Sequence, residues 1–276
     1  TGCAAAQTNM FGSGLASGKL LLGGEQTGSP SLGHTISVEN PSTGTLSWML
    51  DNTRIEPLSR YRCPWIEGYA SHASILPGET LELMISADPP APVQIDIYRL
   101  GYYQGKGGRW MTQVGPIDCP TQATPQPGVL RPMNCQRECT AKLPIKVDWV
   151  SGVYVAKLTE MNQKNQSYII FVVRDDRKSD LVFQVSDHTW QAYNRWPSQF
   201  SLYDDGKNEW HWGDRAQVSF NRPYGKYCQI LDAPLSIGSG EFFLWEFPFL
   251  FWIEREGYDV TYVSNTDTHR DPNTAT

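Results

Sequence analysis

The sequence predicts a β + α/β protein, in which an immunoglobulin-like β-sandwich precedes the first part of an α/β domain. Two patterns predict it. Between about residues 60 and 175, short apolar stretches alternate with turn residues, and no helix longer than a turn is evident. After residue 179, a buried strand, a long apolar helix and a second strand follow one another.

The first 45 residues carry little periodicity. Residues 1–45 are rich in Gly, Ser and Thr and are predicted to form an extended N-terminal arm. The sandwich is assigned to residues 46–178, and residues 113–139, rich in Pro and Cys, are expected to form a loop tied down by disulfides. The clearest strands are expected at 80–86, 93–100, 152–158 and 167–173, where alternating or continuous apolar side chains fit a strand.

The order of elements in the second part of the chain predicts an α/β fold. The charged segment 174–180 marks the boundary, so this part is assigned to residues 179–276. It offers a strand at 181–185, a helix at 240–257 that is apolar almost all round, and a strand at 258–263. A strand–helix–strand unit needs further strands to cover its helix. We therefore expect a second polypeptide or a C-terminal fragment to complete this domain.

Polar residues follow both strands of the α/β part. Asp187 and His188 come after the first strand, and residues 265–269 come after the second. Ligands of α/β sheets bind beyond the carboxyl ends of the strands, so the two segments are expected to line one cleft. Asp187 and His188 are candidate catalytic residues, as a general base or as partners of a metal ligand. The alternative is a loop histidine that is bonded to the backbone.

Composition argues against two classes of partner. The formal net charge is -6 and the pI is about 5.4, so no basic surface is available to neutralise phosphates, and neither a nucleic-acid nor an anionic-membrane partner is expected. No apolar run reaches the length of a transmembrane span.

The six cysteines bear on the compartment. An even number permits three disulfides, and together with the glycosylation motif at Asn165 this favours a secreted protein. A metal site at Cys119, Cys135 and Cys139 is the alternative, although no histidine lies near them. Cys228 is interpreted as structural, because it lacks the strand-to-helix turn of a nucleophile.

Five segments carry a family resemblance. They are IYRLGYYQGKGGR at 97–109, WQAYNRW at 190–196, SLY at 201–203, FNRPY at 220–224 and EREGYDVTY at 254–262. In their order and number they resemble signatures of the large subunit of N,N-dimethylformamidase and its relatives, over roughly residues 55 to 275. The glycine-rich part of the first segment lacks the order of a phosphate loop. It is predicted to form a turn that lays aromatic residues and Arg109 against the next domain.

The resemblance implies a fold and a metal. The α/β part would be of the glutamine-amidotransferase-like type, and the activity would be hydrolysis of linear amides. A mononuclear iron would be held by Tyr193, by Tyr224 and by a glutamate in a His-Asp-Glu-Tyr-Trp-like motif, which the resemblance places after Thr276. Phenolate is a hard oxygen donor that suits ferric iron. Without the resemblance, both tyrosines are ordinary half-buried aromatics.

Two functions from different classes remain open at this point. The first is an amide (C–N) hydrolase-like enzyme with a tyrosinate-bound iron, completed by sequence outside this chain. The second is a secreted, non-catalytic binding or self-assembling structural protein, because an unfinished sheet is a template for another chain. A sugar-stacking role for residues 210–212 rests on their two tryptophans alone, and packing is the simpler interpretation.

Overall fold

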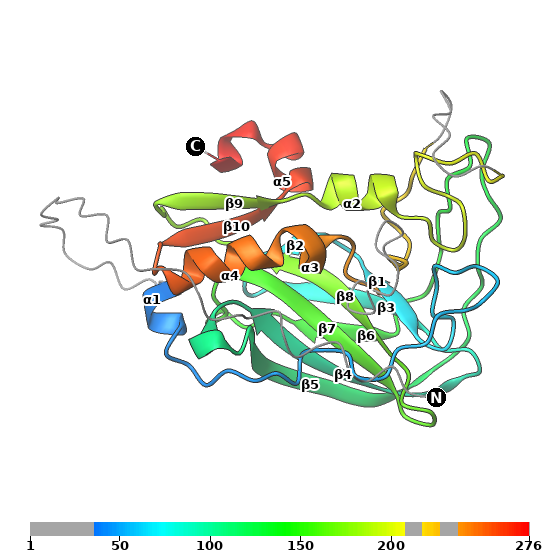
Figure 1. The fold of residues 1–276 in the computed structure, drawn as a ribbon, viewed down its shortest axis with the longest axis horizontal. Coiled ribbons are helices and arrows are strands. Elements are labelled where there is room, and N and C mark those ends of the chain that lie inside the picture. The colour runs from blue at the N-terminus through cyan, green and yellow to red at the C-terminus, as the bar shows by residue number, and fades with distance from the viewer. Residues whose placement is uncertain (1–35, 208–216, 227–236, 276) are drawn as a thin grey trace, which may run out of the picture. The chain divides into compact units, whose positions relative to one another are not determined.

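The protein is described by a computed structural model that covers residues 36–207, 217–226 and 237–275. Two β-sheets form most of it (Figure 1). The five-stranded sheet has the order β2 (Ser74–Ile75), β8 (Gln166–Val173), β7 (Gly152–Glu160), β4 (Ala91–Leu100) and β5 (Gly108–Cys119), and only the β2–β8 pair is parallel. The three-stranded sheet is antiparallel, in the order β1 (Glu67–Ala70), β3 (Thr80–Ser86) and β6 (Ala141–Pro144).

The four strands expected in this region are confirmed. The predicted strand 80–86 is β3, and the other three fall within β4, β7 and β8. Strand β5 was missed, because it lies at a sheet edge and most of its side chains are partly or fully exposed. It extends to Cys119, so the expected loop begins only after that residue.

The core between the two sheets is apolar. Val93, Ile95 and Ile97 of β4 are fully buried and alternate with half-buried residues, as expected of a strand with one face on the core. Strand β8 is buried along its whole length. Its second face is also covered, since the ring of Tyr168 lies 5.4 Å from that of Phe243.

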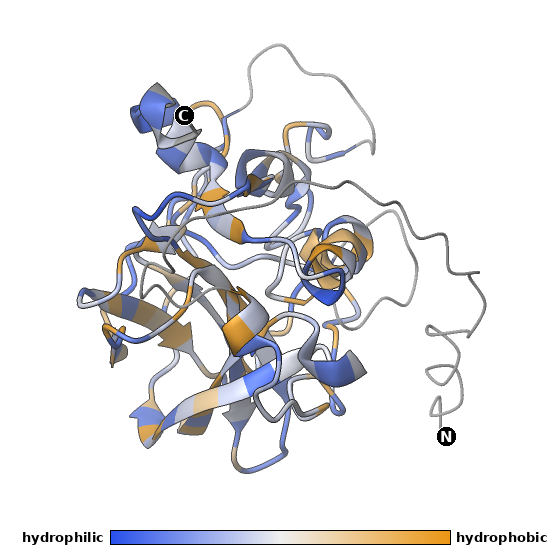
Figure 2. Ribbon diagram, turned by 90° about the vertical axis from the view of Figure 1, so that its left-hand side faces the viewer, coloured by the Kyte–Doolittle hydropathy of each residue, from blue (hydrophilic) through white to orange (hydrophobic). Residues whose placement is uncertain are grey.

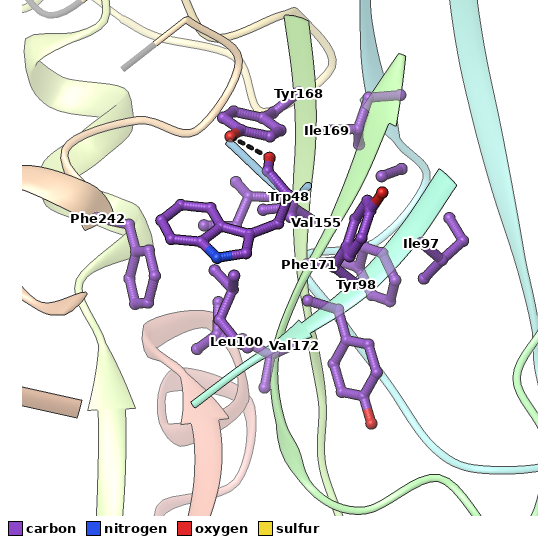
Figure 3. Packing of buried hydrophobic residues seen from close by; sticks show 14 of the residues in the cluster. Trp48, Ile97, Tyr98, Leu100, Val155, Tyr168, Ile169, Phe171, Val172 and Phe242 are labelled. Atoms are coloured by element: carbon purple, nitrogen blue, oxygen red, sulfur yellow. Dashed lines mark hydrogen bonds between the residues drawn. The ribbon is translucent and has the colours of Figure 1, made fainter. Parts of the chain in front are cut away.

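Trp48 joins the five-stranded sheet to the helices of the α/β part. Its ring stacks on that of Phe243 with centroids 5.2 Å apart, and its Nε1 donates to the Lys106 carbonyl at 2.9 Å. Its own carbonyl accepts the hydrogen bond from the Tyr168 hydroxyl that is dashed in Figure 3. Figure 3 also shows Phe242 on one side of the indole and strand side chains on the other. The indole therefore links the two parts of the protein.

The α/β part contains a two-stranded parallel sheet. In it, β9 (Leu181–Val185) pairs with β10 (Val260–Ser264), with Leu181 opposite Val260. The described helices are α1 (Ile36–Glu39), η1 (Tyr103–Gly105), α2 (Asp187–Tyr193), α3 (Phe242–Trp245), α4 (Phe247–Arg255), α5 (Asn265–Arg270) and η3 (Pro272–Ala275). The mixed β + α class is confirmed. Residues 36–39, within the expected extended arm, are helical.

The single helix predicted for residues 240–257 is wrong. The chain forms two helices, α3 and α4, which meet at Glu246. Pro248 lies at the start of α4. Because proline has no amide hydrogen and fixes its own φ, it is tolerated in the first turn of a helix and not in its interior. The proline therefore sets a helix start, where the apolar pattern alone suggests continuity.

A buried ion pair connects the five-stranded sheet to α4. The side chains of Arg99, in β4, and Glu254 are both fully buried, with Nη2 and Oε1 2.7 Å apart. The hydroxyl of Tyr262 donates to Glu254 at 2.8 Å, and Arg99 donates to the Ser151 carbonyl at 2.9 Å. Burial lowers the pKa of Arg99, but Glu254, Tyr103 and Tyr154 together raise it well above its ordinary value, so the guanidinium stays charged.

The glycines of the 97–109 segment make room for these contacts. A Cβ on Gly101 would lie 2.2 Å from Oε2 of Glu254, and one on Gly108 would lie 2.5 Å from Cδ1 of Trp48. Both distances are far below van der Waals contact. The expectation for the aromatics is confirmed, since Tyr102 packs edge-on against Phe251 of α4.

The expectation for Arg109 is wrong. Its guanidinium pairs with Glu39 of α1, with Nη1 and Oε1 2.7 Å apart, and does not reach the α/β part. The hydroxyl of Tyr103 also donates to Glu39, at 2.7 Å. The glycine-rich segment therefore contacts two elements, α4 through Tyr102 and α1 through Tyr103 and Arg109.

We predict that separating the buried pair costs far more than separating a surface pair. Arg99→Met and Glu254→Gln should each lower the free energy of unfolding by about 3–5 kcal/mol, because each leaves a buried charge without its partner. Lys142→Met is the control, since Lys142 and Glu82 are 67% and 43% exposed, and should cost less than about 1 kcal/mol. Urea titrations measure all three, and equal losses would contradict this account.

Candidate functional site

The carboxyl ends of β9 and β10 lie side by side and lead into α2 and α5 (Figure 1). Asp187, at the start of α2, is 2% exposed. Its Oδ1 accepts from the backbone amide of Asn265 at 2.6 Å, and its Oδ2 accepts from the Thr266 hydroxyl at 2.9 Å. The two polar segments that follow the strands therefore meet, as predicted.

Asp187 is both an anchor and a buried acid. Burial raises the pKa of Asp187 above its ordinary value, and the hydrogen bonds from Thr266 and Asn265 oppose that rise. A carboxylate at the first amides of a helix is also favoured by the helix dipole. The side chain thus fixes α5 against α2 whatever further role it has.

His188 is the next residue of α2, and its side chain is exposed. Its Nε2 is 3.2 Å from the Thr266 hydroxyl oxygen, and its ring meets those of Phe220 and His269 edge-on at 5.4 and 6.2 Å. The ring is therefore held by side chains, whereas the alternative interpretation expected a bond to the backbone. Thr266 contacts both His188 and Asp187, which links the two predicted residues.

The two segments that carry the predicted tyrosines are joined by Asn194. Its Nδ2 donates to the Pro223 carbonyl at 2.9 Å, and its Oδ1 accepts from the Gly225 amide at 3.0 Å. Asn194 is buried and directly follows Tyr193, and its two contacts flank Tyr224 in the chain. These hydrogen bonds, here called the Asn194 clamp, hold the Tyr193 and Tyr224 segments together.

Arg222 stabilises the same two segments as the Asn194 clamp, from a buried position between them. Its side chain is fully buried. It donates to the carbonyls of Gln191, Trp196 and Phe200 at 3.0–3.1 Å, and to the side chain of Gln191 at 3.2 Å. Burial lowers the pKa of Arg222 to about 10, which still leaves it charged at neutral pH. The arginine of the FNRPY segment therefore organises the loop that follows α2.

Tyr224 faces the hollow at the strand ends. Residues of β1, β8, α2 and the 220–224 segment line this hollow, among them Asp187, Trp190 and Gln191. The Tyr224 ring meets Trp190 edge-on at 6.1 Å. Burial raises the pKa of Tyr224 above its ordinary value, and Asp187 and Glu246 raise it further. Without a cation, the phenol is neutral at physiological pH.

Tyr193 occupies a different environment. It is the last residue of α2, and its ring packs on that of Tyr203 with centroids 4.5 Å apart. Neither Tyr193 nor His188 is among the described residues that line the hollow, although both lie on the helix that borders it. The structure therefore brings Asp187 and Tyr224 to the hollow itself and places the other two predicted residues beside it.

Glu246 is a functional candidate that sequence reasoning missed. Its Oε1 accepts from Nε1 of Trp190 at 2.9 Å, and it also accepts from the Ser186 amide. Burial raises the pKa of Glu246 to about 7. The signal in the sequence is a carboxyl side chain inside an otherwise apolar stretch, because a buried carboxyl group needs hydrogen-bond partners of this kind.

The cysteines do not behave as expected. No disulfide joins the four cysteines that the structure describes, of which Cys63, Cys119 and Cys135 are buried and Cys139 is exposed. Burial raises the pKa of Cys63 to about 12 and that of Cys135 to about 11, so both are neutral thiols. The loop after Cys119 is held by hydrogen bonds instead, such as that from Gln122 to the Ile85 carbonyl at 2.7 Å.

The cysteine metal site is not supported. Among residues 36–207, 217–226 and 237–275, no group of three His, Cys, Asp or Glu side chains could hold a metal ion. The glycosylation acceptor Asn165 is 4% exposed, with its amide directed at Glu160. Cys3, Cys228 and residues 210–212 lie outside the described residues. No helix in the described part of the chain has the length and apolar character needed to cross a membrane.

We predict that Glu246 lowers the stability of the fold as pH rises. The folded protein keeps the proton that an unfolded glutamate loses, so Glu246 destabilises the fold as pH rises from about 4.5 to about 7. Glu246→Gln stays neutral and keeps an acceptor for Trp190. Relative to this variant, the native free energy of unfolding should fall by on the order of 2 kcal/mol between about pH 5 and 7.

Urea titrations across that pH range measure the difference. The control is Glu256→Gln, because Glu256 is 41% exposed and pairs only with its neighbour Arg255 among the contacts described. This control removes an exposed carboxylate and shows how much of any difference is specific to position 246. Native and Glu246→Gln curves that run parallel would mean that Glu246 titrates normally.

The comparisons with known proteins agree with the motifs. A family model described as N,N-dimethylformamidase beta subunit-like, C-terminal, matches residues 94–276, about two thirds of the chain. No curated protein matches the chain. The matched range includes the Arg99–Glu254 pair, the Asn194 clamp and both predicted tyrosines. The chain belongs to the N,N-dimethylformamidase beta subunit-like family.

Proposed function

We propose that the protein is an amide (C–N) hydrolase that acts on small linear amides. A single iron would be held by Tyr193 and Tyr224, and sequence outside this chain would supply the third ligand. The observation that carries this proposal is the Asn194 clamp, which ties the two tyrosine segments together across 30 residues of chain. Membership of the family supports the same reaction class.

The donor set around Tyr224 suits a hard cation. Besides burial, the carboxyl groups of Asp187 and Glu246 raise the pKa of Tyr224, and the Gln191 hydrogen bond and the Arg222 guanidinium oppose that rise, so acidic side chains lie near the Tyr224 hydroxyl. A cation beside them would reverse the effect and favour the phenolate. Bound iron would supply Lewis acidity, which polarises an amide carbonyl and lowers the pKa of a bound water. Tyr224 in the hollow would be one ligand, and Tyr193, at the end of the helix that borders the hollow, would be the other.

His188 is the proposed general base, with Asp187 behind it. The Thr266 hydroxyl donates to Asp187 and therefore presents its oxygen to His188. With Nε2 of His188 donating to that oxygen, Nδ1 is left as the acceptor for a proton. Asp187 would position Thr266 and α5 and thereby fix the ring. Amide hydrolysis needs such an acceptor for the proton of the attacking water.

The proposal extends to the architecture. Residues 46–178 would form an immunoglobulin-like sandwich after an N-terminal arm of residues 1–45. Residues 179–276 would begin a glutamine-amidotransferase-like domain that a second polypeptide or fragment completes. The family description names a beta subunit, which supports a partner subunit. Secretion remains a proposal that rests on the even number of cysteines, although the four described ones form no disulfide.

We predict that either tyrosine is needed for iron. Tyr193→Phe and Tyr224→Phe should each lower bound iron at least about tenfold in the native assembly, because each removes one anionic ligand. Tyr258→Phe is the matched control, since Tyr258 is 44% exposed and lies after the C-terminal end of α4. Elemental analysis and amide hydrolysis are measured together. Full iron content in both variants would contradict the proposal.

The alternative is a secreted, non-catalytic binding or self-assembling structural protein. The observation that favours it is an edge of β9 that pairs with no strand of the described residues, beside exposed aromatic side chains. A protein of this kind would hold no iron and would hydrolyse no amide in any assembly state. Iron with amidase activity in the native material would exclude it.

A further inference from the structure

Gln191 is a buried polar side chain next to one of the two proposed metal ligands. It lies in α2 between Asp187 and Tyr193, is 1% exposed, and lines the hollow together with Tyr224. Polar side chains usually lie at the surface, as expected for the mostly hydrophilic helical residues that lead to the C-terminus in Figure 2. A buried amide needs partners for both its oxygen and its nitrogen. The identity of these partners therefore indicates the role of Gln191.

The backbone fixes the orientation of the Asn194 amide. Its Oδ1 accepts from the amides of Trp196 and Gly225, each at 3.0 Å. A backbone amide can only donate, so this atom is the oxygen and Nδ2 is the donor. Nδ2 donates to the Pro223 carbonyl at 2.9 Å and to Oε1 of Gln191 at 3.1 Å. Asn194 therefore presents a donor to Gln191.

The orientation of the Gln191 amide follows from its two neighbours. Its Oε1 accepts from Asn194 and also from Nε of Arg222, at 3.2 Å, a proton that Nε shares with the Ser219 carbonyl. A guanidinium has no acceptor, so this end of Gln191 is the oxygen. Only the amide nitrogen of Gln191 remains to contact Tyr224. That nitrogen donates the hydrogen bond that opposes the rise in pKa which burial gives Tyr224.

We propose that Gln191 is a positioning residue for Tyr224, with its amide nitrogen locked so that it donates to the phenol oxygen. An oxygen that accepts this hydrogen bond keeps its own proton free of Gln191, and the same hydrogen bond stabilises the phenolate. The contact is therefore already arranged for the charged form that a metal ligand adopts. The inference rests on the proposed function only in that Tyr224 is assigned as a metal ligand.

The other role open to Gln191 is purely structural, as an acceptor for Asn194 and Arg222. The two roles use different atoms, because Oε1 serves Asn194 and Arg222 and the amide nitrogen serves Tyr224. Gln191→Glu separates the roles. It keeps an oxygen towards Asn194 and Arg222 and replaces only the donor that faces Tyr224 with an acceptor.

The matched control is Gln166→Glu, in β8. Gln166 is also buried, at 6% exposure, and its Oε1 accepts from the backbone amides of Asp51 and Asn52 at 2.9 and 3.2 Å. The control thus places the same carboxyl group at a buried site that holds two donors and no proposed ligand. Urea titrations establish that both variants fold. If the carboxyl group prevents folding at position 191, Gln191→Met, which is uncharged and donates nothing, takes its place.

The first readout needs no iron. Tyrosine labelled with ¹³C at Cζ gives an NMR signal for each tyrosine, and the signal of Tyr224 is the one that Tyr224→Phe removes. Because Cζ carries the phenol oxygen, its chemical shift responds to hydrogen bonding at that oxygen. In the metal-free native assembly, Gln191→Glu should shift the Tyr224 signal and Gln166→Glu should leave it in place. A Tyr224 signal that stays in place in Gln191→Glu overturns the proposal.

The second readout is the visible absorption of the iron-loaded assembly, where ferric phenolates absorb by charge transfer from phenolate to metal. Losing a donor raises the energy of the phenolate electrons, so the band should move to longer wavelength in Gln191→Glu and stay in place in Gln166→Glu. A band that does not move, or moves to shorter wavelength, overturns the proposal.

The two readouts distinguish this proposal from the proposed function. If the NMR signal shifts as predicted and the native assembly holds no iron, the positioning role stands and the proposed function fails. If iron is bound at Tyr224 and neither readout responds to Gln191→Glu, the proposed function stands and the positioning role fails.

Discussion

The arrangement of the whole protein depends on the buried ion pair between Arg99 and Glu254. It joins the end of a central strand of the five-stranded sheet to the helix that connects β9 and β10. Both charges lie out of water, so neither is stable without the other. Tyr262 of β10 binds the same carboxylate, which carries the constraint into the parallel sheet. The strand ends that form the candidate site are thereby fixed to the large β-sheet.

The candidate site is built in the same way, by buried polar groups that tie distant segments together. Asn194 holds the Tyr193 segment to the Tyr224 segment, and Arg222 binds carbonyls on both sides of the turn. Asp187 fixes α5 through the Asn265 amide and the Thr266 hydroxyl. Such groups are costly to bury unless every one is paired, so the loops they hold have one conformation. Such rigidity is what the proposed metal-ligand roles of Tyr193 and Tyr224 would require.

Local sequence patterns predicted most of the secondary structure. They could not predict which distant segments contact each other. The strands at 80–86 and 181–185 follow from alternation and from an apolar run, whereas the edge strand β5 carries no such signal. The break between α3 and α4 follows from Pro248, although the continuous apolar pattern suggests a single helix. The roles of Tyr193 and Tyr224 came from family resemblance, because nothing in their own sequence environment distinguishes them from other tyrosines. The Asn194 clamp joins residues 29 to 31 apart and has no periodic signature.

The most direct test of the account is iron-edge anomalous diffraction from crystals of the native assembly. The account predicts one strong anomalous peak, bonded to the hydroxyl oxygens of Tyr193 and Tyr224 and close to the carboxyl ends of β9 and β10. A peak bound by other residues, or no peak at these two oxygens in crystals of active protein, would contradict it.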